Sequence, residues 1–225
     1  MTKISVIIPA LNEATVIEQT LAHLSLIQGL ELIVVDGGST DETIALARRY
    51  AKVLTTPPGR AIQMNHGARN SSGEILLFLH ADTIVSSVAL EGMVRALEDP
   101  AIVGGAFRLA IDSPRWVLRL VAAAANGRTR LTRIPYGDQG IFVRRSIFEQ
   151  LGGYPAQPLM EDLEFSRRLK RVGRVAILPE AVQTSSRRWD KEGFWYTTLR
   201  NQALVLLYFI RISPDRLARW YQPIR

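Results

Sequence analysis

Residues that can accept hydrogen bonds or bind a cation follow three short apolar runs of the chain, and an acidic pair comes later. In chain order, these stretches are Val6–Glu13 (VIIPALNE), Val34–Asp41 (VVDGGSTD), Phe78–Asp82 (FLHAD) and Met160–Asp162 (MED). In an open parallel sheet, ligands bind beyond the carboxyl ends of the strands. The three polar ends are therefore expected to converge, with the acidic pair facing them. Such a cleft suits a nucleotide, a metal ion and a general base.

The segment after the first apolar run, Pro9-Ala10-Leu11-Asn12-Glu13, has two interpretations. Pro9 ends the strand, and Asn12 and Glu13 then present polar groups at its carboxyl edge and at a helix start. Alternatively, this is an ordinary strand-to-helix turn in which Asn12 caps the helix.

The segment after the second run carries Asp36, followed by Gly37 and Gly38. Glycines let the backbone approach a ligand closely, and Asp36 can accept hydrogen bonds from a base or a ribose. The alternative is a glycine-rich turn into a helix that Ser39 caps, with Glu42 completing a capping box.

His80-Ala81-Asp82 follows the third of these runs. The carboxylate of Asp82 suits a hard cation such as Mg²⁺ or Mn²⁺, which would share its ligands with substrate phosphates. A lone aspartate after a strand is otherwise most often a turn residue.

The composition is that of an ordinary globular domain, with 225 residues, 47% of them hydrophobic and 22% charged. The chain has no cysteine, which excludes disulfides and thiolate chemistry. Its first residues enter a strand directly, without a signal-peptide pattern, so a cytoplasmic protein is expected.

The positive charge is concentrated in the second half of the chain. Residues 1–107 carry 7 Lys and Arg against 11 Asp and Glu, and residues 108–225 carry 21 against 10. This split predicts a basic surface facing something anionic, and charge alone leaves nucleic acid, a phosphorylated substrate and a membrane surface open.

Hydrophobic periodicity predicts strands that alternate with helices in the first half, which favours an α/β fold with a mostly parallel sheet. The expected strands are Lys3–Pro9, Leu30–Asp36, Lys52–Thr55, Glu74–Leu79, Ile102–Ile111, Asp138–Val143 and Val175–Pro179. The expected helices are Glu13–Ile27, Ser39–Tyr50, Arg60–Asn70, Ser86–Asp99, Trp116–Ala125, Arg145–Leu151, Leu163–Val172 and Phe194–Ile210. No linker is apparent, so we expect one domain, 1–225, with a donor half, 1–100, and an acceptor half, 101–225.

Taken together and in this order, the motifs resemble those of the family 2 inverting glycosyltransferases, from Ile4 to about Trp189. The resemblance implies a GT-A fold, a nucleotide-sugar donor in the first half, an acceptor in the second, and a divalent metal, Mg²⁺ or Mn²⁺. By position in the family motifs, Asp82 resembles the metal ligand and Asp162 the catalytic base. The donor-binding residues that it implies are Pro9, Ala10, Asn12, Glu13, Asp36, Gly37, Arg60, Asn65, Gly67, His80, Ala81, Arg187 and Arg188.

The sequence departs from the family pattern at His80, which stands where the first acid of an Asp-x-Asp motif is expected. A neutral imidazole can bind a transition metal, or it can donate a hydrogen bond to a phosphate or a sugar hydroxyl. Both roles stay open for His80 at this point.

The basic half supplies candidates for the acceptor site. Asp138 and Gln139 can hydrogen-bond a sugar or an acceptor hydroxyl, or simply form a tight turn. Glu161 lies beside the expected base, and Trp189 offers a flat face to a sugar or a lipid. The pair Arg187-Arg188 can hold a diphosphate, or it can be a solvated pair beside a core tryptophan.

Phe194–Ile210 is rich in aromatic residues and is flanked by arginines. Such a helix can lie in a lipid interface, cover a core or form a homodimer contact. Its apolar run is too short to cross a bilayer.

The sequence therefore predicts a metal-dependent inverting glycosyltransferase that acts on a hydroxyl or carboxylate acceptor. The basic half favours an anionic or lipid-linked acceptor, with a polyprenyl phosphate or a carotenoid as candidates, and a peripheral position on an anionic membrane.

Two other functions fit the sequence less well. A nucleotidyltransferase would need a glycine-rich basic loop after the first strand, which is absent. A nucleotide- or RNA-binding module fits the basic charge, but its arginines would gather with aromatics on one sheet face, so no nucleic-acid partner is expected.

Overall fold

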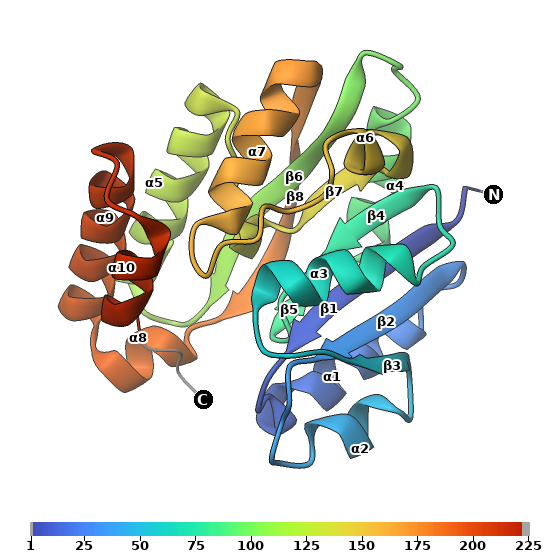
Figure 1. Ribbon diagram of the computed structural model, residues 1–225, viewed down its shortest axis with the longest axis horizontal. Helices are drawn as coiled ribbons and strands as arrows, with labels where there is room; N and C mark the ends of the chain where they lie inside the picture. The colour runs from blue at the N-terminus through green and yellow to red at the C-terminus, as the bar shows by residue number, and fades with distance from the viewer. Residues whose placement is uncertain (1, 222–225) are drawn as a thin grey trace.

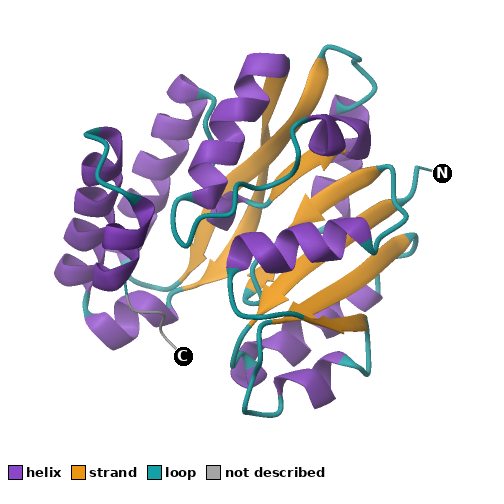
Figure 2. Ribbon diagram, in the orientation of Figure 1, coloured by secondary structure: helices purple, strands orange, loops and turns teal. Residues whose placement is uncertain are grey.

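The computed structural model describes residues 2–221, and its centre is a twisted eight-stranded sheet with helices on both faces (Figures 1 and 2). The strands are β1 Ile4–Ala10, β2 Leu30–Asp36, β3 Lys52–Thr55, β4 Ile75–Phe78, β5 Thr83–Ile84, β6 Ile102–Asp112, β7 Ile141–Arg144 and β8 Arg174–Ser185. Their order across the sheet is β3-β2-β1-β4-β7-β6-β8-β5. The strands from β3 to β4 are parallel, β7 runs antiparallel to both of its neighbours, and β6 and β8 pair in parallel. The expected α/β fold, mostly parallel with a small antiparallel element, is confirmed.

Helices cover both faces and one end of the sheet (Figure 1). Their bounds are α1 Ala14–Ser25, α2 Thr43–Ala47, α3 Arg60–Arg69, α4 Ser87–Ala96, α5 Trp116–Thr132, η1 (a 3₁₀ turn) Gly137–Gln139, α6 Arg145–Gln150, α7 Glu161–Val172, α8 Arg187–Glu192, α9 Phe194–Phe209 and α10 Pro214–Trp220. Helices α1, α2 and α4 bury one core cluster against the sheet, and α3, α6 and α7 bury the other. Helices α8, α9 and α10 lie together at the end of the molecule, beside α5.

The central strand β1 shows why the first half folds as expected. Val6 and Ile8 pack into one core cluster and Ile7 into the other, and all three are fully buried. A strand with both faces covered needs a continuous apolar run rather than an alternating one. The apolar run ends just before the polar segment that begins with Asn12. The burial of β1 therefore determines where this polar segment leaves the core.

Strand β8 extends well beyond the expected end at Pro179. Proline lacks a backbone N–H and normally ends a ladder. Here the pairing of β6 with β8 is irregular between Ala106 and Arg108, opposite Ile177 to Ala181, and Pro179 falls within that irregularity. A bulge thus accommodates the proline, which the sequence pattern could not reveal.

The expected strand Asp138–Val143 is wrong in its first half. Residues Gly137–Gln139 form the turn η1, and β7 begins only at Ile141. Gly140, between them, has a φ of 63°, in the left-handed region, which glycine adopts without a steric penalty.

The expected capping box of Ser39 is also wrong. Helix α2 begins at Thr43. The Thr43 backbone N–H donates a hydrogen bond to Asp41 Oδ1 at 3.0 Å, so Asp41 and not Ser39 contacts the start of this helix. Likewise Asn12 does not cap α1, whose N-cap position is Glu13 and has no side-chain cap hydrogen bond.

Helix α3 approaches the sheet closely at Gly67. A Cβ added there would lie 2.5 Å from the Ile7 Cγ2 and 3.0 Å from the Val35 Cγ2, both in the core. Gly67 is therefore a packing residue, and its expected place beside the nucleotide stays a prediction.

We predict that Gly67→Ala destabilises the fold by about 1–3 kcal/mol through overpacking, although alanine is the better helix former. Gly127→Ala is the matched control, because a Cβ there, within α5, meets no atom within 4 Å. The control should be neutral or slightly stabilising in urea unfolding. Equal stability of the two variants would contradict the close packing of α3.

Candidate active site

The loops that follow β1 and β2 are joined into one rim at the carboxyl edge of the sheet. The Thr40 backbone N–H donates to Asn12 Oδ1 at 2.8 Å, and the Asn12 N–H donates to Ser39 Oγ at 2.8 Å. The Glu13 N–H donates to Thr43 Oγ1, also at 2.8 Å. Asn12 has a φ of 55°, a left-handed conformation that asparagine tolerates better than most residues. The side chain of Asn12 thus holds the rim in shape.

Asp36 is fully buried at the end of β2. Its Oδ2 accepts from the backbone N–H groups of Gly38 at 2.7 Å and Ser39 at 2.8 Å, and its Oδ1 accepts from Ser39 Oγ. This carboxylate therefore shapes the glycine-rich loop, and its expected contact with a base or ribose stays a prediction.

Gln63, on α3, ties the ends of β1 and β2 together. Its Nε2 donates to the carbonyl oxygens of Ala10 at 2.8 Å and Val35 at 2.7 Å, and the Gly37 N–H donates to Ala10 O at 2.9 Å. Gln63 was not among the expected site residues. Its place four residues before Gly67, on the same face of the expected helix, was the available signal.

Asn65 and Ala81 are positioned by the fold rather than aimed into a cleft. Asn65 Nδ2 donates to Tyr154 O and Asn65 Oδ1 accepts from the Tyr154 N–H, both at 2.8 Å. That amide joins α3 to the loop after α6. The side chain of Ala81 is buried in a core cluster. The expected places of both residues beside the nucleotide stay predictions.

Asp82 lies just before β5 and is linked to the end of β8. Its Oδ1 accepts from Thr184 Oγ1 at 3.4 Å, and its Oδ2 accepts from Arg187 Nε at 3.1 Å. The Arg187 Nη2 is 2.5 Å from Glu13 Oε2. The first residue of α8 thus forms ion pairs with two acids that follow different strands. Burial raises the pKa of Glu13, Arg187 opposes that rise, and the charge of Asp82 adds to it.

A second charged cluster surrounds Gly137 at the same edge. Arg60 Nη2 is 2.6 Å from His80 Nε2, and Arg60 Nε is 3.2 Å from Glu161 Oε1. A Cβ on Gly137 would lie 2.8 Å from Arg60 Nη2 and 3.1 Å from both Asp162 Oδ2 and His80 Nε2. The absence of a side chain at Gly137 therefore lets these groups converge.

His80 is neutral in this cluster. A guanidinium can only donate, so His80 Nε2 accepts from Arg60 and carries no proton on that nitrogen. Burial and the positive charges of Arg60, Arg188 and Arg187 place the pKa of His80 well below its usual value. Because its Nε2 lone pair is used, the geometry favours a hydrogen-bonding role for His80 over metal ligation.

Asp162 stands in the first turn of α7, where backbone groups orient its carboxylate. Its Oδ2 accepts from the Gly137 N–H at 2.6 Å, and its Oδ1 accepts from the Leu163 N–H at 2.7 Å. Burial and then the nearby Asp162 raise the pKa of Glu161 to about 7, despite the opposing charge of Arg60. The pKa of Asp138 rises to about 6 for the same two reasons, against the opposing charge of Arg128.

Gln139 is placed differently from its expected acceptor role. It is fully buried, and its Oε1 accepts from Thr129 Oγ1 at 2.7 Å and from the Tyr136 N–H at 3.3 Å. The amide therefore fixes the turn η1 against α5. Asp138, next to it, is half-buried, and its Oδ1 has no hydrogen-bond partner.

Helix α8 places Arg188 and Trp189 among the C-terminal helices. The Arg188 guanidinium lies 4.7 Å from the centre of the Tyr221 ring, and Trp189 Nε1 donates to Thr198 Oγ1 at 3.3 Å. Both side chains are half-buried. Arg188 also contributes to the electrostatic environment of His80, which places it near the second charged cluster.

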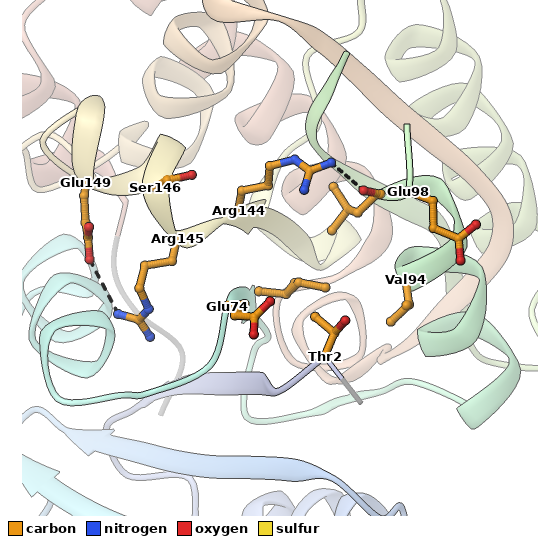
Figure 3. A pocket seen from close by; sticks show the side chains of 10 residues that line it. Thr2, Glu74, Val94, Glu98, Arg144, Arg145, Ser146 and Glu149 are labelled. Carbon is orange, nitrogen blue, oxygen red and sulfur yellow. Dashed lines mark hydrogen bonds and ion pairs between the residues drawn. The ribbon is translucent and has the colours of Figure 1, made fainter. Parts of the chain in front are cut away.

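A cavity of about 610 Å³ lies at the opposite edge of the sheet, near Thr2 and Glu74 (Figure 3). Its two arginines bind backbone carbonyls, Arg144 Nε to Ile102 O at 2.9 Å and Arg145 Nη1 to Ala68 O at 3.0 Å. None of the expected site residues lines this cavity, and its arginines serve to hold segment ends together.

The family model for glycosyl transferase family 2 matches residues 5–152, well over half of the chain. The probable glycosyltransferase YdaM of Bacillus subtilis is 30% identical over 250 residues, covering 96% of this chain and 60% of that protein. The PGL/p-HBAD biosynthesis glycosyltransferase of Mycobacterium tuberculosis is 32% identical over 168 residues, covering 67% of this chain and 62% of that protein. The chain thus spans about 60% of the length of these relatives.

Two solved structures show the same fold. The mannosyltransferase PcManGT from Pyrobaculum calidifontis superposes with a TM-score of 0.69 at 24% identity, covering 97% of this chain and 68% of that one. The glucosyl-3-phosphoglycerate synthase from Mycobacterium tuberculosis gives 0.64 at 24% identity, covering 92% and 79%. The match to the family model and this agreement in fold lead to one conclusion: the chain belongs to glycosyl transferase family 2.

Proposed function

We propose that the chain transfers a sugar from a nucleotide-diphosphate donor to an acceptor oxygen, with inversion at the anomeric carbon. The observation that carries the proposal is the meeting of the acids Glu13, Asp82 and Asp162 with the cations Arg60 and Arg187 at one edge of the sheet. Transfer of a sugar from a nucleoside diphosphate needs both signs of charge there: acids to bind a metal ion and to accept a proton, and cations for the leaving diphosphate.

The structural relatives support the choice of donor. PcManGT was solved in complex with GDP-Man and Mn²⁺, and glucosyl-3-phosphoglycerate synthase with Mn²⁺, UDP and its product. For this chain we infer that residues 1–100 hold the nucleoside over the rim formed by Asn12, Glu13 and the loop of Asp36. Arg187 and Arg188, from the second half, would then hold the diphosphate.

The residues at the sheet edge fit a divalent ion that would be bound by the protein and by the donor's phosphates together. Within residues 2–221, no three His, Asp or Glu side chains are close enough to hold a metal by themselves. Asp82 offers a carboxylate at the sheet edge, and ions such as Mg²⁺ commonly take one or two carboxylates together with substrate phosphates and waters. When bound, the ion would neutralise charge that develops on the leaving diphosphate.

Asp162 would act as the general base. Two backbone N–H groups fix its orientation, and the missing side chain at Gly137 lets Asp162 lie close to Arg60 and His80. Its carboxylate would take the proton from the acceptor hydroxyl as that oxygen attacks the anomeric carbon. One displacement inverts the centre, so no covalent sugar-enzyme bond is needed. Glu161, which is ion-paired to Arg60, would help to hold Arg60 at the site.

We predict that Asp162→Asn lowers turnover by about 10²–10⁴, because an amide cannot accept the proton. Its donor affinity should stay close to that of the wild type. The donor is first identified by thermal-shift screening of UDP-, GDP- and dTDP-sugars with Mn²⁺. Asp215→Asn, on the exposed start of α10, is the control and should keep its turnover. Full turnover by Asp162→Asn would move the base to Glu161 or Asp138.

For the acceptor, we infer a lipid-linked molecule at an anionic membrane surface. One face of α9 exposes apolar side chains, with Trp195 at 74%, Leu199 at 64% and Leu206 at 64% exposure. Only Thr197 and Leu204 of α9 are fully buried, which argues against a core helix. None of the helices described between residues 2 and 221 has the length and apolar content needed to cross a bilayer.

The sequence suggests that the arginines in and beside α9 are available to lipid, but Arg200 and Arg211 differ in their exposure. Arg200 forms a two-pronged ion pair with Glu192, at 2.5 and 2.6 Å, and is only 10% exposed. It therefore cannot contact lipid headgroups, whereas Arg211, just after α9, is exposed. The positive excess of residues 108–225 provides the charge complementarity to anionic lipid.

We predict peripheral binding to vesicles that contain anionic lipid, weakened by high salt. The double variant Leu199→Gln/Leu206→Gln should lose most of this binding in flotation assays. Leu26→Gln, at the end of α1 and even more exposed at 82%, is the control and should float like the wild type. If the wild-type protein does not float at low salt with anionic vesicles, the acceptor is not presented at a membrane by this face.

A further inference from the structure

Arg187 lies between Asp82 and Glu13, and its side chain touches both acids with different nitrogens. The Nε binds Asp82 Oδ2 at 3.1 Å and the Nη2 lies 2.5 Å from Glu13 Oε2. Exposure of the three side chains is 26% for Arg187, 13% for Asp82 and 17% for Glu13. The ion pairs are therefore mostly shielded from water, which makes them stronger than surface pairs.

The guanidinium lies against the oxygen of Asp82 that is not bound to Thr184. Asp82 Oδ1 accepts from Thr184 Oγ1, and Oδ2 accepts from Arg187 Nε. A metal ion coordinated to the same carboxylate would lie close to the guanidinium, and the two positive charges would repel each other where water screens them little. Arg187 and the metal ion therefore compete for Asp82.

We propose that Arg187 neutralises Asp82 before the donor binds. When metal and nucleotide bind together, the guanidinium leaves Asp82 and binds the diphosphate instead. The inference rests on the proposed function, which gives Asp82 to the metal ion and Arg187 to the diphosphate. The metal ion then takes over the neutralisation of Asp82, while the guanidinium gains phosphate oxygens as its new acceptors.

This exchange makes the binding of metal and nucleotide cooperative. Metal alone must remove Arg187 from Asp82 without giving it a new acceptor, so binding of metal alone is weak. A diphosphate supplies that acceptor, so each ligand strengthens the other by the same factor, as linkage requires. Arg187 is then a positioning residue whose replacement changes the two binding steps in opposite directions.

The test is calorimetric titration of Mn²⁺ alone, and of GDP and UDP with and without Mn²⁺. For Arg187→Gln we expect Mn²⁺ alone to bind about 10-fold tighter or more, and the better of the two nucleotides with Mn²⁺ to bind about 10-fold weaker. A merely structural role would weaken both. Arg216→Gln, on the exposed side of α10, is the control: it removes the same charge without a bond to Asp82, so its affinity for Mn²⁺ alone should stay within about threefold of the wild type.

Arg187→Lys provides a second variant that keeps the charge near the buried acids, in case the glutamine variant does not fold. A lysine has one ammonium instead of a two-pronged fork, so its affinity for Mn²⁺ alone should rise to a smaller extent. Unchanged or weaker binding of Mn²⁺ alone in a folded Arg187 variant overturns the exchange and leaves the proposed function standing. Wild-type nucleotide binding that is independent of Mn²⁺ overturns both.

Discussion

The pairing of two arginines with a group of clustered acids is the constraint on which the rest of the site depends. Asp82 and Glu13 lie around Arg187, and Glu161 and Asp162 lie around Arg60. Carboxylates brought together and shielded from water repel each other and lose hydration, so they need cations between them. Burial disfavours the charge of Arg60, yet Glu161 and Asp162 outweigh this and raise its pKa. Each cation comes from a different element than the acids it binds, so the site forms only when the two halves of the chain pack together.

The sheet topology explains how acids from distant segments meet. The parallel strands β1, β2 and β4 end at one edge, which places the loops that carry Glu13, Asp36 and Asp82 side by side. The antiparallel β7 enters the sheet beside β4 and is preceded by the turn η1, so Gly137 arrives at the same edge. Strand β8 then ends with Thr184 next to Asp82 and leads into Arg187. At the opposite edge, by contrast, the arginines bind backbone carbonyls, and the acids that line the cavity there, Glu74, Glu98 and Glu149, are exposed.

The sequence was sufficient to predict the fold class, because it follows from local pattern. Apolar runs set the strands, and polar residues just after them must emerge at the carboxyl edge, which is where the structure has Asp82. The contacts of Asn65 and Gly67 were harder to predict, because their partners lie far along the chain. Gln63 lay in a segment already singled out, but only the structure reveals the two carbonyls that it binds. Arg200 looked like a surface cation because its partner Glu192 sits eight residues away, across the turn between α8 and α9.

We place the donor site at the carboxyl edge of the sheet, where Asp82 lies. The most direct measurement is a crystal structure of the protein with Mn²⁺ and the nucleoside diphosphate that binds best, with anomalous diffraction used to locate the manganese. We expect a manganese peak at coordination distance from Asp82, bridged to the diphosphate, with Arg187 turned away from Asp82 toward the phosphate oxygens. A manganese ion distant from Asp82, or a nucleotide bound in the cavity near Arg144 and Arg145, would contradict it.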